Sequence, residues 1–317
     1  MSAGHHHGHH HARSSLTTRA ALASVATALF LLALKAWAAW ETGSVAMLGS
    51  LADTGLDLVA SLIILFGVRV AAMPADPEHR FGHGKAESIA ALVQSGIIVV
   101  SALAIAWRAG ERLLHGERTA HAEYGIGVSL VAIGFTFALL AYQRFVIRRT
   151  GSVAIRADHV HYQSDLLLNL SVIVALVLEQ YAGLIGADPL FGVGIAAWLL
   201  FGAWRASSHA VDQLMDREWP EEKRRRLVEL AAGHSGIRGI HDLRTRSSGS
   251  HDFVQFHVWV DPAMTVAEAH RMMEGVEAAL QAEFPACEIL IHLDPEGQVD
   301  EPGNPLVETD LIRQGPP

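Results

Sequence analysis

Six long apolar segments occupy the first 210 positions, and they restrict the fold more than any other feature of the chain. Each comes close to the roughly 20 mostly apolar residues that a membrane-spanning helix requires. Half of the 317 residues are hydrophobic and only 18% are charged, which argues against a soluble two-domain enzyme and against disorder. We therefore predict an all-α bundle of six transmembrane helices, over residues 17–40, 44–70, 88–114, 122–147, 154–182 and 187–210.

The Lys and Arg residues between these segments predict the orientation of the bundle. Seven of them lie around the loops between spans two and three and between spans four and five, at Arg69, Arg80, Lys85, Arg144, Arg148, Arg149 and Arg156. Only Arg108, Arg112 and Arg118 lie around the loops of the opposite face. Because cytoplasmic loops carry the excess of these residues, we expect both termini in the cytoplasm.

A soluble region follows the spans, with a linker and a domain over residues 211–295. Its pattern predicts a helix over 220–232, strands over 237–246 and 252–260, a helix over 265–283 and a strand over 287–292. The residues Thr265 to Glu268 form a capping box that opens the second helix. The order αββαβ predicts an α+β domain, in which helices cover one face of a small open sheet.

The two ends of the chain differ in composition from the rest. Residues 1–16 form a His-rich arm, with histidines at 5, 6, 7, 9, 10 and 11, which is either an expression tag or a native metal-buffering arm. Residues 296–317 are acidic and rich in Pro and Gly, and without an apolar period they predict a disordered tail.

Charge and cysteine content exclude some partners and some metal sites. The formal net charge of −9 and the lack of a basic stripe argue against nucleic-acid binding. The single cysteine, Cys287, excludes an intrachain disulfide and a thiolate cluster. A metal site in this chain must therefore use nitrogen and oxygen ligands.

Two pairs of polar residues interrupt the apolar spans at a spacing of four. Asp53 and Asp57 share one face of the second span, where each ionised carboxylate costs about 2.5–3.5 kcal/mol near mid-bilayer. His161 and Asp165 form the matching pair in the fifth span. If the two faces meet, three carboxylates and one imidazole surround a point that suits a tetrahedral cation such as Zn²⁺.

The sequence allows other interpretations of these pairs. They could cap helices, bond to a neighbouring helix, or form a proton relay in another class of transporter. Asp158 and His159 lie just before the second pair, and we interpret them as polar residues at the cytoplasmic end of the fifth span rather than as ligands.

Four motifs together resemble one family of membrane proteins. They are Thr42-Gly43-Ser44-Val45, Asp53-x-x-x-Asp57, the run Phe81-Gly82-His83-Gly84-Lys85-Ala86-Glu87-Ser88, and His161-x-x-x-Asp165. The combination resembles the cation diffusion facilitator family, and within it the zinc and iron exporters of bacteria, over nearly all of residues 17–295. The resemblance implies a secondary active transporter, not an enzyme, that works as a homodimer in the inner membrane. It would export divalent metal in exchange for protons and carry a metallochaperone-like cytoplasmic domain.

The resemblance also implies where metal binds. The transport site would comprise Asp53, Asp57, His161 and Asp165, and a lower-grade site in the loop after the second span would comprise Asp76, His79 and His83. A two-metal site at the dimer contact of the cytoplasmic domain would comprise His241, His257, His270, His292 and Asp294. Lys85 would pair with Asp216 across the dimer.

Zn²⁺ is the expected cargo, and also the structural or regulatory ion of the cytoplasmic site. Cd²⁺, Fe²⁺ and Mn²⁺ fit the transport ligands with different strength. The histidines outside the membrane could instead be incidental. A non-transporting, membrane-anchored metal sensor is the competing function, but an anchor has no need of Asp53 and Asp57 in mid-bilayer.

Overall fold

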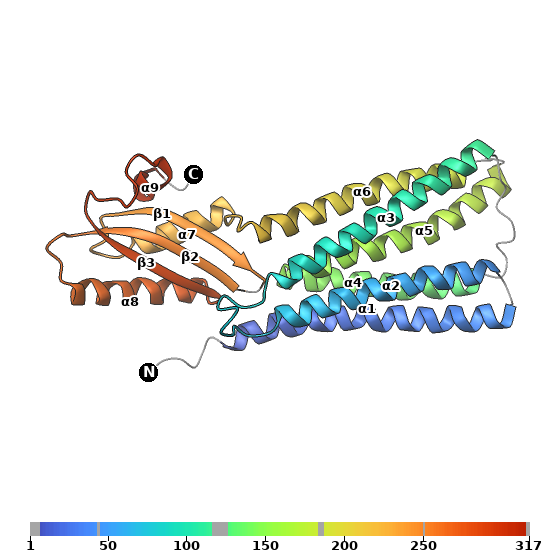
Figure 1. Cartoon of the computed structure of the whole chain (residues 1–317), viewed down its shortest axis with the longest axis horizontal. Coiled ribbons are helices and arrows are strands. Elements are labelled where there is room, and N and C mark those ends of the chain that lie inside the picture. The colour runs from blue at the N-terminus through green and yellow to red at the C-terminus, as the bar shows by residue number, and fades with distance from the viewer. Residues whose placement is uncertain (1–6, 43–44, 116–125, 183–186, 250, 315–317) are drawn as a thin grey trace. The chain divides into compact units, whose positions relative to one another are not determined.

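The computed structural model of the chain describes residues 7–42, 45–115, 126–182, 187–249 and 251–314 (Figure 1). It divides into two compact units, one over residues 13–211 and the other containing residues 212–317. The first six residues of the predicted His-rich arm lie outside the described residues.

The first unit is helical throughout its described part. Its elements are α1 (His7–Thr42), α2 (Val45–Ala71), α3 (Ala86–His115), α4 (Ile126–Thr150), α5 (Val153–Ala182) and α6 (Ala187–Leu214). Each predicted span falls on one of these helices. The prediction of a helical membrane region is therefore confirmed.

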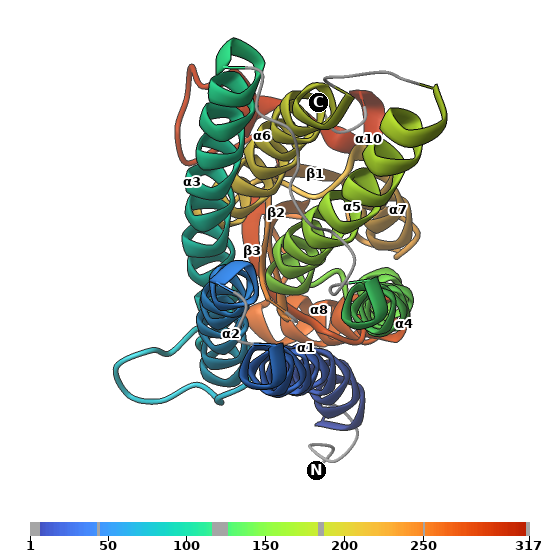
Figure 2. The ribbon, with the colours of Figure 1, turned by 90° about the vertical axis from the view of Figure 1, so that its right-hand side faces the viewer.

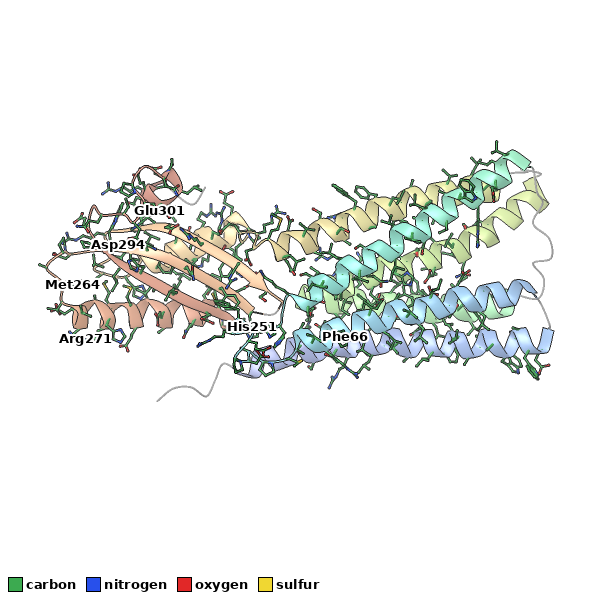
Figure 3. All side chains as sticks on the ribbon, viewed as in Figure 1. Phe66, His251, Met264, Arg271, Asp294 and Glu301 are labelled. Atoms are coloured by element: carbon green, nitrogen blue, oxygen red, sulfur yellow. The ribbon has the colours of Figure 1, made fainter. Side chains whose placement is uncertain are left out.

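The outer surface of this unit is apolar, as a lipid-facing surface should be. Among the described residues, α1, α2, α3, α4 and α6 are long and apolar enough to cross a membrane. Phe66, Trp107 and Trp204 are 71%, 71% and 74% exposed, and Figure 3 shows Phe66 on α2. Exposed apolar area of this extent marks contact with another apolar phase, which here is the bilayer.

Small residues allow the helices to approach one another closely, as is typical of membrane bundles. The α2 helix packs against α3 and α5, and α5 also packs against α3 and α4 (Figure 2). At Gly67, an added Cβ would lie 2.4 Å from the Cβ of Ala90. Glycine at this position therefore permits the close contact between α2 and α3.

The second unit contains the predicted α+β domain. Its elements are α7 (Glu221–Ala232), β1 (Gly239–Ser248), β2 (His251–Val260), α8 (Val266–Glu283) and β3 (Cys287–Pro295). The order αββαβ is confirmed. β2 lies in the middle of the sheet, antiparallel to β1 and parallel to β3, and the Thr265 capping box opens α8.

Alternation along the strands gives the sheet two different faces. Val254, Phe256 and Val258 are buried in a core with residues of α7 and α8. His257 alternates with these residues and lies on the other face. The register pairs His241 with His257 and His257 with His292, so that the three strands carry a row of histidines.

The tail differs from the predicted disorder over its last described residues. It forms the short helices α9 (Pro305–Glu308) and α10 (Leu311–Gln314), which pack against β1 and α7. Val307 and Leu311 are only 1% and 4% exposed, and Asn304 caps α9. Burial of these two apolar side chains helps to hold the segment against the domain, although its composition is that of a disordered chain.

Candidate metal centres

The structure brings three of the predicted transport ligands together inside the helical unit. His161 Nε2 on α5 lies 3.2 Å from Asp57 Oδ1 on α2 and 3.9 Å from Asp165 Oδ2 one turn along α5. One ligand atom from each residue lies within 4.8 Å of the other two. His161 is buried, and its Nε2 has no hydrogen-bond partner among the described residues. A buried imidazole nitrogen beside two carboxylates is a suitable donor set for a divalent cation.

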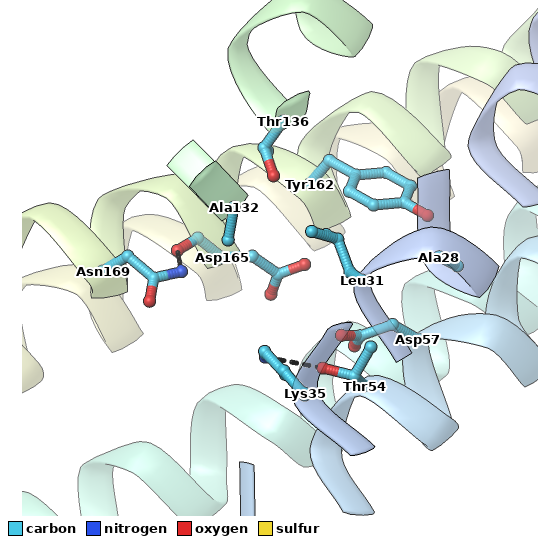
Figure 4. Close-up of a pocket in the computed structure, with 10 residues that line it drawn as sticks. All are labelled: Ala28, Leu31, Lys35, Thr54, Asp57, Ala132, Thr136, Tyr162, Asp165 and Asn169. Carbon is cyan, nitrogen blue, oxygen red and sulfur yellow. Dashed lines mark hydrogen bonds between the residues drawn. The ribbon is translucent and has the colours of Figure 1, made fainter. Parts of the chain in front are cut away.

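A cavity of about 30 Å³ adjoins these carboxylates (Figure 4). That volume holds an object the size of a water molecule. Asp57 and Asp165 line it together with Thr54, Asn169 and Lys35 of α1. The ammonium group of Lys35 donates a hydrogen bond of 2.6 Å to Thr54 Oγ1, so that a cationic side chain shares the cavity with two anionic ones.

Asp53 does not belong to this group of three. It lies on α2 one turn before Asp57, as predicted, but its side chain is exposed. The spacing of four places both aspartates on one side of α2, but of the two it is Asp57 that approaches His161 of α5.

A buried polar network lies one helical turn from the group of Asp57, His161 and Asp165. Asp158 is completely buried, and its Oδ2 accepts hydrogen bonds from Ser24 Oγ at 2.6 Å and Gln143 Nε2 at 2.8 Å. Tyr162 Oη donates to the Ser24 carbonyl at 3.0 Å and lies 2.8 Å from Ser61 Oγ. The network joins α1, α2, α4 and α5. Asp158 was interpreted from the sequence as a polar residue at the end of the fifth span rather than a ligand, and it lies in this network, outside the group of Asp57, His161 and Asp165.

His159 is half-buried and contributes to the same network. Its Nδ1 lies 3.1 Å from Gln143 Oε1. Gln143 thus connects His159 with Asp158, and both residues next to the predicted ligands hold helices together.

The loop after α2 gathers the second predicted group. Asp76 Oδ1 lies 3.2 Å from His79 Nδ1, and Asp76 Oδ2 lies 3.3 Å from His83 Nε2. The backbone N–H groups of His79 and Glu78 donate to Asp76 Oδ1 and lower the pKa of this carboxyl. The carboxylate therefore stays ionised, and its two histidines offer nitrogen ligands beside it.

The charge pair of Lys85 and Asp216 is predicted between two subunits, not within one chain. The two residues belong to different units of one chain, and within its own unit Asp216 lies 3.6 Å from Arg246. The pairing across a dimer stays a prediction.

The second unit gathers four of its five predicted ligands on the face of the sheet opposite the apolar core, where His241 and Asp294 are buried. Asp294 Oδ2 lies 3.1 Å from His241 Nε2 and 2.9 Å from His257 Nδ1, and Asp294 Oδ1 lies 3.3 Å from His292 Nε2. Figure 3 labels Asp294 on β3. The fifth residue, His270 on α8, is exposed and lies 3.5 Å from Glu274, apart from the cluster.

Burial favours the neutral form of one histidine of this cluster, His241. Burial is the main effect on His241 and lowers its pKa, so this imidazole keeps a free lone pair near neutral pH. Burial also raises the pKa of the Cys287 thiol to about 12. That thiol is therefore a poor ligand, since a metal binds the thiolate, and the cluster offers only nitrogen and oxygen.

Comparison with known proteins gives the family of the chain. A family model described as "Cation efflux transmembrane domain" matches residues 21–215. A second, described as "Cation efflux protein, cytoplasmic domain", matches residues 219–296. The chain belongs to the cation efflux family.

Relatives of this cation efflux protein cover almost its whole length. The Cation-efflux pump FieF of Pectobacterium atrosepticum is 45% identical over 286 residues, which are 90% of this chain and 95% of the relative. The Cation-efflux pump FieF of Yersinia pestis is 46% identical over 276 residues, 87% of this chain and 92% of the relative. The resemblance inferred from the sequence motifs is thereby confirmed.

Two solved structures are similar to part of the chain. The Zn form of CzrB is 34% identical and covers 27% of this chain and 99% of its own, with a TM-score of 0.24. A nickel form of the MamM CTD is 31% identical and covers 24% of this chain and 99% of its own, with a TM-score of 0.23.

Sequence reasoning missed several polar residues beside the candidate metal-binding groups of this cation efflux protein. Lys35 was one lysine in an apolar run, and only the fold shows that it lines the cavity of the carboxylates. Asp242 Oδ2 and Asp300 Oδ2 lie 3.6 Å and 3.7 Å from ring nitrogens of His257. A charged residue in a predicted span is a signal for Lys35, whereas no pattern in the sequence indicates Asp300.

Proposed function

We propose that this chain exports a divalent metal ion, Zn²⁺ in the first place, from the cytoplasm across the bacterial inner membrane. Protons would move in the opposite direction, and the working unit would be a homodimer with both termini in the cytoplasm. Membership of the cation efflux family supports the general activity. The observation that carries the specific proposal is the convergence of Asp57, His161 and Asp165 inside an apolar helical unit.

The proposed transport site comprises Asp53, Asp57, His161 and Asp165. One imidazole and carboxylate oxygens are ligands that Zn²⁺ accepts in tetrahedral sites. Cd²⁺, Fe²⁺ and Mn²⁺ are further candidates, since affinity order alone does not decide selectivity. Asp53 would turn toward the other three when a cation is bound.

Exchange for protons follows from the chemistry of the ligands. Metal binds the deprotonated carboxylate and the neutral imidazole, so protons and metal compete for the same atoms. At the cytoplasmic side the site would take up metal. At a more acidic exterior, protonation of the ligands would favour release, and the protons would return with the empty site.

The polar network around Asp158 supports a rigid moving part. It connects α1, α2, α4 and α5 through Ser24, Gln143 and Tyr162. We expect these four helices to move together against α3 and α6. Such a movement would open the site alternately to each side of the membrane.

The groups outside the bundle would support transport rather than perform it. Asp76, His79 and His83 would hold a weakly bound ion near the cytoplasmic surface. The cytoplasmic cluster of His241, His257, His292 and Asp294 would hold regulatory or structural Zn²⁺, with His270 contributing at the dimer contact. Lys85 and Asp216 would pair between subunits.

The alternative, a membrane-anchored sensor, explains the cytoplasmic cluster but not the intramembrane group. Each carboxylate in the bilayer destabilises the inserted helix by about 2.5–3.5 kcal/mol, and membrane anchoring does not require such a carboxylate. The location of Asp57 and Asp165 beside a cavity favours transport.

Transport by purified protein in liposomes tests the proposal. We expect uptake of Zn²⁺ that depends on an imposed pH gradient, with Cd²⁺, Fe²⁺ and Mn²⁺ compared under the same gradient. Asp57→Asn should reduce the flux to that of empty liposomes, whereas His257→Ala, the matched change in the cytoplasmic cluster, should leave a measurable flux. Equal flux in the parent and in Asp57→Asn would contradict the proposed site, and flux without any dependence on pH would contradict proton exchange.

A further inference from the structure

Three carboxylates from separate segments converge on the ring of His257 in the cytoplasmic unit. Asp294 of β3 and Asp300 of the tail approach Nδ1, at 2.9 Å and 3.7 Å, and Asp242 of β1 approaches Nε2 at 3.6 Å. Asp294 and Asp242 are almost buried, whereas the Asp300 side chain is 60% exposed. Asp300 is therefore the carboxylate that solvent can reach.

The tail that carries Asp300 is fixed to the domain on both sides of this residue. Before it, the N–H of Glu296 donates to the Val260 carbonyl at 3.0 Å, and Trp259 Nε1 donates to the Gln298 carbonyl at 2.6 Å. After it, Val307 and Leu311 are buried against the domain. The carboxylate is thus held near the histidine row by contacts that do not involve Asp300 itself.

Asp300, His257 and His292 form a donor set of their own. One ligand atom from each lies within 4.8 Å of the other two, and the rings of the two histidines have centroids 4.6 Å apart. Two imidazoles and one carboxylate, with a side open to water, match the three protein ligands and one water of many open zinc sites. Asp300 also lies beyond residue 296, where the match to the family's cytoplasmic domain ends.

We infer that the tail of this chain is a metal-responsive clamp, in which Asp300 binds a divalent cation together with His257 and His292. A cation held by all three residues ties the tail to the sheet. By linkage, a docked tail strengthens binding of the cation as much as the cation stabilises docking. This inference rests on the proposed role of the cytoplasmic cluster as a metal site, and adds the tail as its regulated part.

The full-length protein in detergent provides the test, in an Asp57→Asn background that weakens the membrane site. Zn²⁺ titration calorimetry gives the affinity, and hydrogen exchange of the amides of residues 300–314, with and without Zn²⁺, reports docking of the tail. The His-rich arm contributes the same background to every variant. Asp300→Asn should weaken the cytoplasmic binding step about 10-fold or more, the range found for lesser perturbations of metal sites, and should abolish the protection of the tail by Zn²⁺.

Two further variants make the result specific. Glu301→Gln removes the same charge from the next residue, outside the donor set, and should retain the affinity of the parent. Asp300→His replaces one zinc ligand by another and should restore the protection of the tail. Parental affinity and tail protection in Asp300→Asn, with loss of both in His257→Ala, would overturn the clamp alone. No effect in any variant, His257→Ala included, would remove the cytoplasmic metal site on which the clamp depends.

Discussion

Two buried glutamines of the helical unit allow a paired test of how polar groups stabilise it. Gln143 uses Nε2 to bond Asp158 and Ser24, and its Oε1 meets His159. Gln94 is equally buried, but neither its Nε2 nor its Oε1 has a partner among the described residues. The same substitution, glutamine to leucine, should therefore destabilise the unit at Gln143 but not at Gln94.

The magnitudes follow from the hydrogen bonds at each site. Gln143→Leu removes one of the two donors to the buried carboxyl of Asp158, and a hydrogen bond to such a group is worth about 1.5–3 kcal/mol. Gln94→Leu removes a buried amide without partners, whose desolvation costs about 1–3 kcal/mol. For a unit of this size, 1 kcal/mol corresponds to about 2–4 °C in Tm. We expect Gln143→Leu to lower Tm by several degrees and Gln94→Leu to leave it unchanged or raise it.

Thermal unfolding of the detergent-solubilised protein, followed by tryptophan fluorescence and by loss of the monodisperse peak, measures both variants. The difference between them is more informative than either value, because the detergent affects both alike. Equal decreases in Tm for the two variants would refute the argument, since they would show that volume and shape at these positions matter more than hydrogen bonding.

Three further perturbations test other parts of the structure. Gly67→Ala should destabilise the bundle by about 1–3 kcal/mol, because the added methyl group overpacks against α3. Gly134→Ala is the control: nothing lies within 4 Å of its added Cβ, and it should stabilise the bundle by up to about 1 kcal/mol. The Tm values of the two variants test this difference. Burial lowers the pKa of His241, so the folded state binds fewer protons than the unfolded state. The stability of the metal-free protein should therefore fall as pH drops below about 6.5. Hydrogen exchange of β1 between pH 7.5 and 5.5 measures this loss of stability, and His241→Asn should reduce it. Thr265→Ala removes the cap of α8 and should cost about 1 kcal/mol, seen as faster hydrogen exchange in the first turn of that helix.

The elements of this fold could be predicted because they depend on local patterns. An apolar run of about 20 residues has few alternatives to a spanning helix, and periods of two and 3.6 residues distinguish the strands from the helices of the cytoplasmic domain. The tail could not be predicted in this way. Val307 and Leu311 are two apolar residues in a polar segment, and their burial depends on a surface formed by β1 and α7.

The candidate sites were predictable only in part, for a related reason. Pairs at a spacing of four, such as His161 and Asp165, are visible in the sequence because one helix positions both residues. The bond between Ser24 and Asp158 joins residues 134 positions apart, and no local pattern indicates it. Lys35 and Asp300 are likewise single residues whose neighbours come from other elements.

The proposed transport site has three carboxylates, and Lys35 gives a physical reason for the third. The cavity contains Asp57, Asp165 and Lys35, and a divalent cation there would leave a formal charge of +1 in an apolar bundle. A third carboxylate, that of Asp53, would bring the sum to zero.

If Asp53 serves to compensate Lys35, the loss in Zn²⁺ affinity caused by Asp53→Asn should be smaller in a Lys35→Met background than in the parent. A double-mutant cycle measures this coupling, which for residues of one network amounts to about 0.5–3 kcal/mol, and Lys35→Arg, which keeps the charge, should behave as the parent. Additive effects of the two substitutions would show that Asp53 acts independently of the lysine, and the charge balance would then not explain the third carboxylate.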